Sequence, residues 1–502
     1  MATAAQSRST ADLEILLALE LRRGRLRHEL LGALRAAVQD GRLAAGSRLP
    51  ASRQLAARLG VSRGVVTDTY EQLAAEGYLG VRERQAPVVA RIARPATSLA
   101  SGPAGAQTAV PERTRQMFRY DFVATTPDVE LFPRREWGRA LDAALRDATN
   151  DDLDYGDHRG RIELRAALAA YLGRVRGVRI TPDRILVSQG FTQALALVCR
   201  VLLVRGAREL WFESPSLAEE WETVRASGLA VRPVPVDRDG LITDLLPRRR
   251  GAAVVVTPAH QFPTGAVLSA PRRNELVAWA RRHDALIIED DYDAEFRYDR
   301  AAIGAVQGLD PDHVIHVGTA SKTLAPGVRL GWLSLPAALV GEVREAKAAA
   351  DSGSPALDQL AFAAFLGAGD YDRHVVRVRT AYRGRRDRLL RSLVAHALDL
   401  RAEGAAAGLH VLVRLPGIDD VALARAAASA GIGVRPLSPM YLAGSSSESG
   451  LVLGYGRLPV ERIDDAVAAL AGVIRSVRRG GSPAAREADP PVEAAAAPPR
   501  SR

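Results

Sequence analysis

The chain contains only two lysines among its 68 basic residues, Lys322 and Lys347. Arginine supplies every other one of these cations, but it cannot act as a Schiff-base amine, so each lysine needs its own explanation. Lys347 lies in a polar, alanine-rich helical pattern, GEVREAKAAA, and we expect a solvated surface residue there. Lys322 directly follows an apolar, strand-like run in VIHVGTASKTLAPG, and an amine at the end of a buried strand could form a Schiff base.

A carboxylate and a phenol follow another strand-like run. The segment ALIIE continues into Asp290, Asp291 and Tyr292. Ligands of parallel α/β sheets gather beyond the carboxyl ends of the strands, which would bring these groups close to Lys322. Pyridoxal phosphate needs a lysine for its aldehyde and an acidic partner that keeps its ring nitrogen protonated, and a nearby phenol tunes the ring. These residues therefore indicate a pyridoxal phosphate pocket.

The same pocket would need donors for a phosphate group. A Gly-Phe-Thr turn follows the strand-like run RILVS and opens the helical run TQALALVCRVLL, whose first N–H groups and positive dipole end form an anion site. Two hydroxyl residues precede Lys322, and an arginine seven residues after it could close the cage. The expected phosphate donors are Gly190, Phe191, Thr192, Thr319, Ser321 and Arg329.

A different chemistry is indicated in residues 1–94. They hold 15 arginines and 9 acidic residues, which gives +6 of the net charge of +10. This asymmetry suggests a module that binds a polyanion. Two short helical patterns, the first beginning at Ser52, are joined by a tight LGV turn, and Ser62 can cap the second. This arrangement predicts a helix-turn-helix, with a basic three-helix bundle that binds no DNA as the alternative.

The second helix of such a motif enters the major groove by its N-terminal end. Hydroxyl and guanidinium groups that lead into the first helix can hold phosphates. The expected DNA contacts are Arg48, Ser52, Arg53, Ser62, Arg63, Gly64 and Thr67.

Composition limits what the remainder of the chain can be. Of 502 residues, 47% are hydrophobic and 25% charged, as in soluble globular proteins. No apolar run reaches the length of about 18 residues that a membrane span needs, and the N-terminus lacks the apolar region of a secretory signal. The single cysteine, Cys199, lies in an apolar run, where we expect a core residue and no disulfide. These features favour a reducing, cytoplasmic location, and we expect no metal site and no membrane partner.

Periodicity divides the chain further. In the N-terminal part Leu30, Leu34 and Val38 share one helical face, and a second helix beginning near Ser62 presents three apolar residues on one side. Beyond residue 118, helical patterns alternate with apolar runs such as AAVVV, ALIIE and HVIHV, which predicts an α/β domain with a mainly parallel sheet. The expected organisation is a disordered tail (1–20), a winged helix-turn-helix (21–94), a flexible linker (95–117), an α/β domain (118–478) and a disordered tail (479–502).

The N-terminal motif resembles a known family. The run RLRHELLGALRAAVQDGRLAAGSRLPASRQLAARLGVSRGVVTDTYEQLAAEGYL is similar to the winged-helix domain of GntR-family bacterial repressors, which implies binding to double-stranded operator DNA. One departure lies in the wing between the strand-like runs YLGVR and APVVARI. Its tip reads Arg82-Glu83-Arg84-Gln85, without the glycines that are usual in the family, although Arg82 and Arg84 could still meet phosphates.

The second domain resembles fold type I aminotransferases. The segments YGDHRGRIELRAALAAYL, SQGFTQALALV, TPAHQFPTGAVLS, IIEDDYDAEF and ASKTLAPGVRLGW match that fold in order and spacing, and the HQFPTG and EDDYD forms next to a GntR-like head are those of the MocR/GabR regulators.

That resemblance implies a role for each pocket residue. Lys322 would form the internal aldimine of pyridoxal 5'-phosphate, Asp290 would pair with the pyridinium, and Tyr292 with the ring hydroxyl. Of the others, Arg329 would bind the phosphate, His260 and Gln261 would lie near the ring, and Tyr155 would reach the phosphate of a partner subunit, which implies a homodimer.

Two departures concern the ligand. Leu217 occupies the place of the aromatic residue that stacks on the ring in the family, so stacking is lost unless Trp221 takes over. Val452 occupies the place of the arginine that binds a substrate carboxylate, and Arg457 and Arg435 are the nearby candidates for that task, if they are not solvated surface arginines. An effector other than an ordinary α-amino acid is therefore possible.

By this resemblance we expect a transcriptional regulator that binds operator DNA and senses a small amine or amino acid through an external aldimine. Two alternatives stay open. The intact Lys322, Asp290 and Tyr292 favour an active aminotransferase with an accessory DNA-binding domain. Leu217 favours a vestigial domain that serves only as a dimerisation scaffold.

Overall fold

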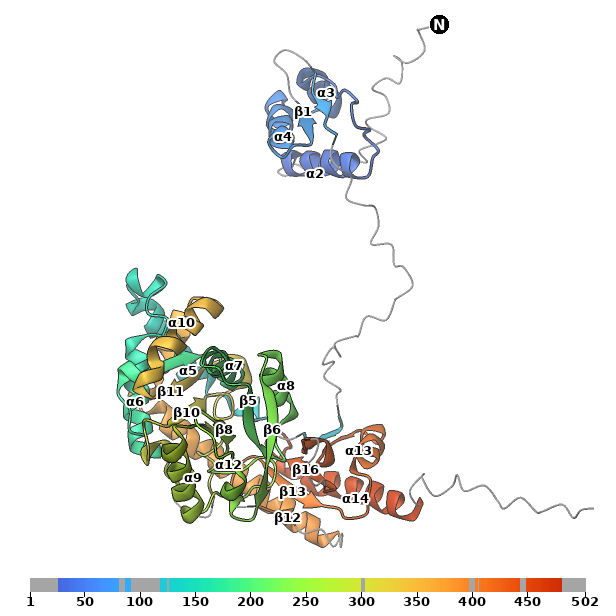
Figure 1. Cartoon of the computed structure of the whole chain (residues 1–502). Helices are drawn as coiled ribbons and strands as arrows, with labels where there is room; N and C mark the ends of the chain where they lie inside the picture. Colours follow the sequence, from blue (N-terminus) through green and yellow to red (C-terminus); the bar gives the residue numbers. More distant parts are fainter. Residues whose placement is uncertain are drawn as a thin grey trace, which may run out of the picture. The chain divides into compact units, whose positions relative to one another are not determined.

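The structure is a computed structural model of the chain, and it divides into two compact units, Met1–Thr114 and Arg115–Arg502 (Figure 1). It describes residues 26–80, 86–91, 118–123, 126–298, 303–396, 402–404, 406–442 and 448–480. The tail expected at 1–20, the linker expected at 95–117 and the wing tip at 82–85 lie outside the described residues.

The described residues of the N-terminal unit form three helices and a short hairpin of strands: α2 (Leu26–Gln39), α3 (Ser52–Leu59), α4 (Arg63–Ala75), β1 (Leu79–Gly80) and β2 (Val88–Val89). Gly60 ends α3 in the left-handed conformation at φ 64°, which lets the chain turn sharply into α4. The Ser62 hydroxyl accepts a hydrogen bond from the Val65 N–H at 3.4 Å, so Ser62 is the N-cap that the sequence predicts.

One apolar core holds this unit together. It joins the two helical faces that the sequence predicts, and the Tyr70 hydroxyl donates to the Pro50 carbonyl at 3.0 Å inside it. The fully or almost fully buried members on these faces are Leu30, Leu34, Val38, Val66, Tyr70 and Leu73. Burial of this core fixes α4 relative to α3.

The larger unit is built on an eight-stranded sheet in the order β4-β11-β10-β9-β8-β5-β6-β7. The neighbours from β10 to β6 pair in parallel, and β11 and β7 pair antiparallel to their neighbours. The strands are β4 (Ile185–Ser188), β5 (Glu209–Ser214), β6 (Ala230–Asp237), β7 (Gly240–Leu241), β8 (Ala253–Val256), β9 (Leu286–Asp291), β10 (Val314–Thr319) and β11 (Gly331–Ser334). The mainly parallel sheet is confirmed.

Both faces of this sheet are covered by helices. Alternate residues of one strand enter different cores: Val255 packs in the cluster that contains α7, whereas Val254 packs in the cluster that contains α9. The helices of the unit are α5 (Arg134–Asp147), α6 (Ile162–Arg176), α7 (Phe191–Val204), α8 (Ala218–Ala226), α9 (Ala270–His283), α10 (Val340–Asp351), α11 (Ala356–Gly367), α12 (Asp370–Ala395), α13 (Asp420–Ser429) and α14 (Ile463–Gly480).

A smaller antiparallel sheet lies in the C-terminal part, with the order β12-β13-β16-β15. Its strands are β12 (Ala402–Glu403), β13 (His410–Arg414), β15 (Arg435–Pro436) and β16 (Gly450–Gly454), and a separate parallel pair joins β3 (Tyr120–Asp121) to β14 (Ile432–Gly433). In Figure 1, α13 and α14 lie beside this sheet. Helix α14 runs two residues past the boundary expected at 478, with Arg478 and Arg479 in its last turn, where cations stabilise the helix dipole.

Two sequence expectations about single residues have opposite outcomes. Cys199 is fully buried in the core between α7 and the sheet, as predicted. Lys347 is also fully buried, so the expectation of a solvated surface lysine is wrong. Its Nζ donates to Asp351 at 2.6 Å, Ser354 at 2.9 Å and Gln193 at 3.1 Å, and these polar partners make burial of the amine possible.

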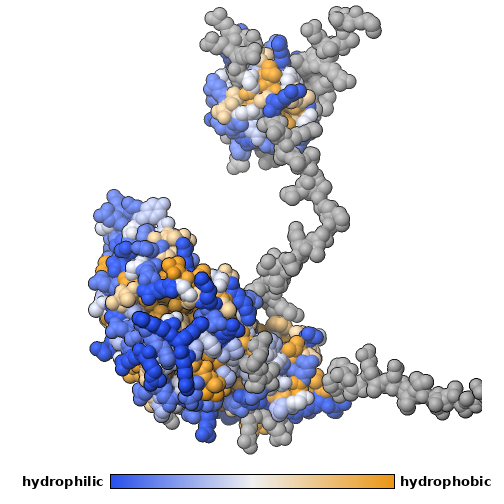
Figure 2. All heavy atoms as spheres, viewed as in Figure 1, coloured by the Kyte–Doolittle hydropathy of each residue, from blue (hydrophilic) through white to orange (hydrophobic). Residues whose placement is uncertain are grey.

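None of the described helices is long and apolar enough to cross a bilayer. On the face of the larger unit seen in Figure 2, hydrophilic residues predominate and apolar ones form separate patches.

Candidate functional site

The carboxyl ends of the central strands meet at one edge of the large sheet. Strands β9 and β10 are parallel neighbours, with Asp290 opposite Val317, so Asp290 and the turn after Thr319 that carries Lys322 lie side by side. Strand β8 is the neighbour of β9 on its other side and leads into His260. The topology thus gathers the residues that the sequence predicts for one pocket.

Asp290 and Asp291 are neighbours on β9 with opposite surroundings. Asp291 accepts two hydrogen bonds from the buried guanidinium of Arg176, at 2.7 and 2.8 Å, and lies 2.9 Å from His316. Although burial alone would raise the pKa of Asp291, the charge of Arg176 and these hydrogen bonds hold it well below its usual range. Arg176 and His316 therefore account for the charge of Asp291.

Asp290 faces the pocket. It is 5% exposed, and its Oδ1 has no hydrogen-bond partner among the described residues. Burial, followed by the nearby carboxylates of Glu220 and Asp291, raises its pKa well above the usual value, and Lys322 only partly offsets this. A buried carboxyl oxygen without a partner is costly, and a donor brought by a ligand would relieve that cost.

Lys322 follows β10 in the turn next to Asp290. Burial lowers the pKa of its amine, while the carboxylates of Asp290, Asp293 and Glu220 act in the opposite direction. A lowered pKa increases the share of neutral amine, which is the nucleophilic form. The amine is thus placed and tuned for bonding to a carbonyl carbon.

Tyr292 and His260 lie together beside this pair. The Tyr292 hydroxyl donates to the His260 carbonyl at 3.1 Å, and His260 Nδ1 lies 3.0 Å from Asp293 Oδ2. Burial, and then the charges of Asp293 and Asp290, raise the pKa of Tyr292 well above its usual value, so the phenol keeps its proton. Gln261 plays a different part: its amide donates to the carbonyls of Pro215 and Phe262, at 2.8 and 2.6 Å, and holds these loops together.

Four of the phosphate donors that the sequence predicts lie together at the start of α7: Gly190, Phe191, Thr192 and Arg329. Gly190 precedes the helix at φ 93°, and a Cβ at this position would lie 3.2 Å from the Arg329 guanidinium, so glycine permits the close approach. Arg329 also donates to the Gln189 carbonyl. The first N–H groups of α7, at Phe191 and Thr192, have no partner from an earlier helical turn. The arrangement is that of an anion site.

The two hydroxyl residues before Lys322 are tied to each other and to the chain. Thr319 Oγ1 donates to Ser321 Oγ at 2.9 Å and accepts from the Ser321 N–H at 3.1 Å. These bonds shape the turn that carries Lys322. Thr319 is buried and Ser321 is partly exposed, so Ser321 is the more accessible of the two hydroxyls.

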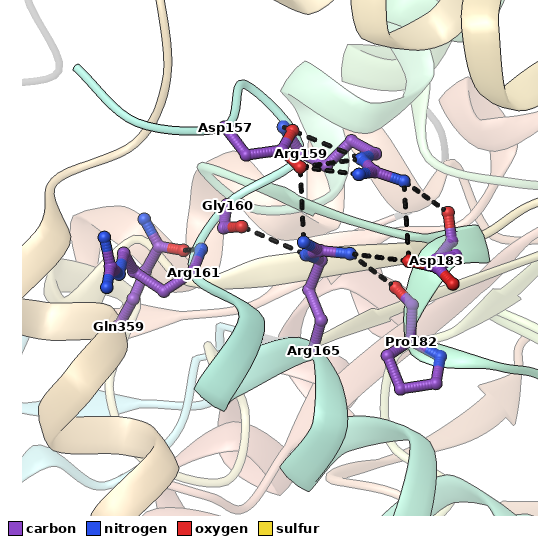
Figure 3. A network of polar contacts seen from close by, with 8 residues as sticks. All are labelled: Asp157, Arg159, Gly160, Arg161, Arg165, Pro182, Asp183 and Gln359. Carbon is purple, nitrogen blue, oxygen red and sulfur yellow. Dashed lines mark hydrogen bonds and ion pairs between the residues drawn. The ribbon is translucent and has the colours of Figure 1, made fainter. Parts of the chain in front are cut away.

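Tyr155 lies apart from these residues within one chain, with 80% of its surface exposed. A polar network fixes the turn that follows it (Figure 3). Arg165, almost fully buried, donates to the carbonyls of Gly160 and Pro182 at 3.0 and 2.8 Å, and Asp157 accepts from Arg159 at 2.6 Å. Side-chain hydrogen bonds therefore hold the turn that follows the exposed Tyr155.

The two departures from the aminotransferase pattern lie together. Phe262, Leu412, Leu437, Met440 and Val452 form one apolar cluster, and Leu217 and Tyr292 pack against it. Leu412 and Val452 are direct neighbours across β13 and β16. Trp221 does not replace the missing aromatic ring, because it is buried and its Nε1 donates to Ser216 Oγ at 2.8 Å. The wall of the pocket beside Tyr292 is therefore apolar.

The two candidate arginines have different positions. Arg435 is the direct neighbour of Val452 across β15 and β16, and its charge contributes to the lowered pKa of Lys322. Its guanidinium pairs with Glu219 at 3.1 Å. Arg457 pairs with Asp121 at 2.8 Å. Arg435 is therefore the arginine on the side of the pocket, and neither is a lone surface cation.

Sequence reasoning missed several charged groups of the pocket. Burial raises the pKa of Glu213 to about 7, and burial and Glu219 raise the pKa of Glu220 to about 8. Burial lowers the pKa of His410 well below its usual value, and its ring lies 5.0 Å from that of His260. Asp293, three residues after Asp290, stood within a quoted motif, but no signal in a single sequence indicates that Glu213 and Glu220 face the site.

The N-terminal unit presents the residues that the sequence predicts for DNA binding. At the start of α4, Ser62, Arg63 and Gly64 are exposed, and Thr67 Oγ1 donates to the Arg63 carbonyl at 3.0 Å. Around the start of α3, Arg48 and Arg53 are exposed and Ser52 is partly exposed. These residues leave basic and hydroxyl groups at the accessible end of the second helix of the motif.

Each of the two units matches a known protein family. Residues 26–89 match the family described as bacterial regulatory proteins, gntR family, and residues 132–469 match aminotransferase class I and II. An archaeal alanine:glyoxylate aminotransferase superposes with a TM-score of 0.66 and 28% identity over 71% of this chain and 91% of its own. The two matches define the class: a helix-turn-helix regulator with an aminotransferase-like domain.

Two relatives that match most of the chain narrow the class. The chain is 32% identical to the probable rhizopine catabolism regulatory protein MocR of Rhizobium meliloti, over 91% of this chain and 95% of that protein. It is also 32% identical to the HTH-type transcriptional regulator YhdI of Bacillus subtilis, over 85% of this chain and 91% of its relative. The protein belongs to the MocR-type family of HTH-type transcriptional regulators.

Proposed function

We propose that this regulator depends on pyridoxal 5'-phosphate, binds double-stranded operator DNA through its winged-helix unit, and senses a small amine or amino acid in its aminotransferase-like unit. One observation carries the proposal. The buried Oδ1 of Asp290 lacks a partner among the described residues and lies beside the turn of Lys322. A ring nitrogen that donates a proton to Asp290 would satisfy this oxygen.

The donor set fits this cofactor. When bound, pyridoxal phosphate supplies an aldehyde carbon that bonds to amines and a protonated ring that withdraws electrons. Asp290 would hold the ring nitrogen, Tyr292 the ring hydroxyl, and Lys322 the aldehyde carbon. The α7 N-terminus with Arg329 would hold the phosphate. His260, Thr319 and Ser321 would complete the pocket, and Gln261 would position its loop.

The chain's own groups manage the protons. Burial lowers the pKa of the Lys322 amine, so this side chain would offer the neutral amine that can bond to the aldehyde carbon when the cofactor is bound. Tyr292 keeps its proton for donation to an oxygen. The apolar cluster beside Leu217 excludes water from this reaction.

DNA binding would use the exposed end of α4. Arg63 can reach base edges, and Arg48 and Arg53 can hold phosphates. The protein would act in the cytoplasm, where a bacterial operator is accessible.

Assembly as a homodimer completes the pocket in this proposal. Tyr155 is 80% exposed on its own chain, and the network in Figure 3 holds the residues that follow it. By the family resemblance, its side chain would reach the phosphate of a partner subunit.

An absorbance titration of the purified protein tests the proposal. Amines and amino acids are added to the cofactor-loaded protein, and binding of an operator fragment is measured with and without each compound. The proposal expects that a compound which changes the absorbance also changes DNA affinity. An absorbance that responds to no amine would overturn the sensing role.

A second candidate is an active aminotransferase, favoured by the complete set of Lys322, Asp290 and Tyr292. Val452 counts against it, since the usual carboxylate-binding arginine is absent from that position. Formation of an amino acid from an added keto acid, at many turnovers per chain, would establish this activity.

A further inference from the structure

Glu220 is a carboxylate of the pocket that none of the proposed cofactor contacts uses. It lies in the first turn of α8, and its N–H donates to the Leu217 carbonyl at 3.1 Å. Residues three apart on a helical turn lie on one side, so Glu220 lies next to Leu217. Leu217 packs against the cluster that contains Tyr292 and Val452. Glu220 therefore borders the apolar wall of the pocket.

The other carboxylates near Lys322 have partners. Glu219 pairs with Arg435 at 3.1 Å, and Asp293 lies 3.0 Å from His260. Glu213 accepts hydrogen bonds from the N–H and hydroxyl of Thr257 at 3.0 and 2.5 Å. Asp290 is the partner proposed for the ring nitrogen. No residue in the described part of the chain donates a hydrogen bond to the Glu220 carboxylate or forms an ion pair with it.

This lack of a partner has an electrostatic consequence. Burial, followed by the charge of Glu219, raises the pKa of Glu220 to about 8, and the charge of Lys322 acts only in part against it. Because Glu220 is partly exposed, contact with water limits this rise. A cation brought next to it would favour the ionised form and would bind as a charge-assisted hydrogen bond.

Among the described residues of this wall, an anionic group of a ligand would find no comparable partner. The position of the usual carboxylate-binding arginine is Val452, and Arg435, its neighbour across the strands, is already paired with Glu219. A ligand carboxylate would have to displace Glu219 and would also approach Glu220. Charge at this wall therefore favours a cationic ligand group over an anionic one.

We propose that the effector carries a second basic group and that Glu220 binds it. The effector class is a diamine, or an amine that also bears a guanidinium, with one amino group at Lys322 and the other cation at Glu220. This inference rests on the proposed function, because it assigns the ligand of the same pocket.

Three four-carbon probes separate the possibilities: 1,4-diaminobutane, 1-aminobutane and 4-aminobutanoate. They share one amine and differ at the far end, which is cationic, apolar or anionic. Each is titrated into the full-length, cofactor-loaded protein, and the dissociation constant is taken from the absorbance change. Longer and shorter chains of each type are included. We expect the best diamine to bind about tenfold or more tightly than the matched monoamine, and the amino acid to bind most weakly.

Two variants on one helix assign the effect. Glu220→Gln keeps the shape and removes the charge. It should erase the diamine preference, measured as the ratio of the dissociation constants for 1-aminobutane and 1,4-diaminobutane. Glu222→Gln, at an exposed position of α8, should leave all three affinities unchanged.

The outcomes separate this inference from the proposed function. If no probe changes the absorbance, the proposed function fails. If amines respond without a preference for the diamine, or if the preference survives in Glu220→Gln, the assignment of Glu220 is wrong and the sensing role stands. Tighter binding of 4-aminobutanoate than of the diamine would contradict the proposal and would indicate that Arg435 binds a ligand carboxylate.

Discussion

At the scale of single residues, two adjacent carboxyl groups show how surroundings decide chemistry. Asp290 and Asp291 point to opposite faces of β9, as successive strand residues do. Arg176 satisfies Asp291 from one face, whereas Asp290 enters the pocket with one oxygen unpartnered among the described residues. A buried carboxyl left in this state is available to a ligand, and its neighbour is not.

Lys322→Ala should abolish the covalent attachment of the cofactor. The reason is that Lys322 lies at the strand end beside Asp290, whereas the other lysine, Lys347, is enclosed by Gln193, Asp351 and Ser354. The measurement is borohydride reduction followed by mass spectrometry of the peptides. The wild-type protein should carry the adduct on Lys322. An adduct on Lys347 in the variant would contradict the assignment.

Asp290→Asn should change the pH dependence of stability in the cofactor-free protein. The folded-state pKa of Asp290 is raised, so the folded protein binds this proton more tightly than the unfolded chain does. Its contribution is favourable below the ordinary carboxyl pKa and is lost as pH rises toward the raised value.

The free energy of unfolding of the wild-type protein should therefore fall relative to that of Asp290→Asn as the pH rises from the ordinary carboxyl pKa of about 4 toward the raised value. Urea denaturation at several pH values measures the difference. A constant difference across this range would show that Asp290 titrates normally. The same variant should hold pyridoxal phosphate more weakly, because the ring nitrogen loses its counter-charge.

The sequence identified some site residues and missed others for physical reasons. Lys322 and Asp290 could be found because they follow apolar runs whose strand ends meet by topology. Glu220 could not be found because its position beside the pocket depends on how Leu217 packs. No pattern of residue types in the sequence around Glu220 indicates that packing. The burial of Lys347 was not predicted because its partners Gln193 and Ser354 lie outside its own helix. Hydrogen bonds to these partners allow the lysine to be buried.

At the scale of elements, hydrogen bonds around the buried Lys347 join α7 to α10. Gln193 in the first turn of α7 accepts hydrogen bonds from Lys347 at 3.1 Å and from the Gln189 N–H at 2.8 Å. Its amide donates to Asp351 at 2.7 Å. The turn that precedes the anion site is thereby fixed to the C-terminal end of α10.

Lys347→Met should lower the free energy of unfolding by about 2–3 kcal/mol, since it removes three hydrogen bonds and leaves Asp351 without its counter-charge. Thermal denaturation of the full-length protein measures the loss. Arg344→Met, at an exposed position of the same helix, serves as the control and should change stability by less than about 0.5 kcal/mol. Equal effects of both substitutions would show that the hydrogen bonds of Lys347 do not stabilise the protein.

The start of α4 is the second element with a defined task. Arg63→Ala should reduce the ratio of operator affinity to random-DNA affinity by about 1–3 kcal/mol, because a guanidinium at this position can bind a base edge bidentately. Competition binding at fixed salt measures the ratio, with Arg58→Ala on α3 as a control. A uniform loss on both DNAs would identify Arg63 as a phosphate contact.

At the scale of the whole molecule, the fold was more predictable than the site. The apolar runs that end at Val256, Glu289 and Val317 became neighbouring parallel strands, because fully buried strands between helices admit few other arrangements. The small antiparallel sheet was not foreseen, since its strands β12 and β15 are two residues long and carry no periodic pattern.

The last prediction concerns assembly on DNA. Tyr155 is exposed just before a turn that a polar network holds, and we propose that it completes the pocket of a second copy, so each dimer would present two winged-helix units. The sequence predicts a flexible linker of 23 residues between the units, with an r.m.s. span of roughly 25 Å. Two tethered heads raise the effective concentration of the second binding event. Full-length protein should therefore bind an operator with two half-sites at least about tenfold more tightly than one with a single half-site. Small changes of the spacing between the half-sites should cost little affinity.

Footprinting on the two operators measures these affinities. The variant Tyr155→Ala should weaken cofactor retention and leave α4 intact, so it separates effects of dimer assembly from effects on the DNA contacts of the winged-helix units. Equal affinity for one and two half-sites would mean that the heads act singly.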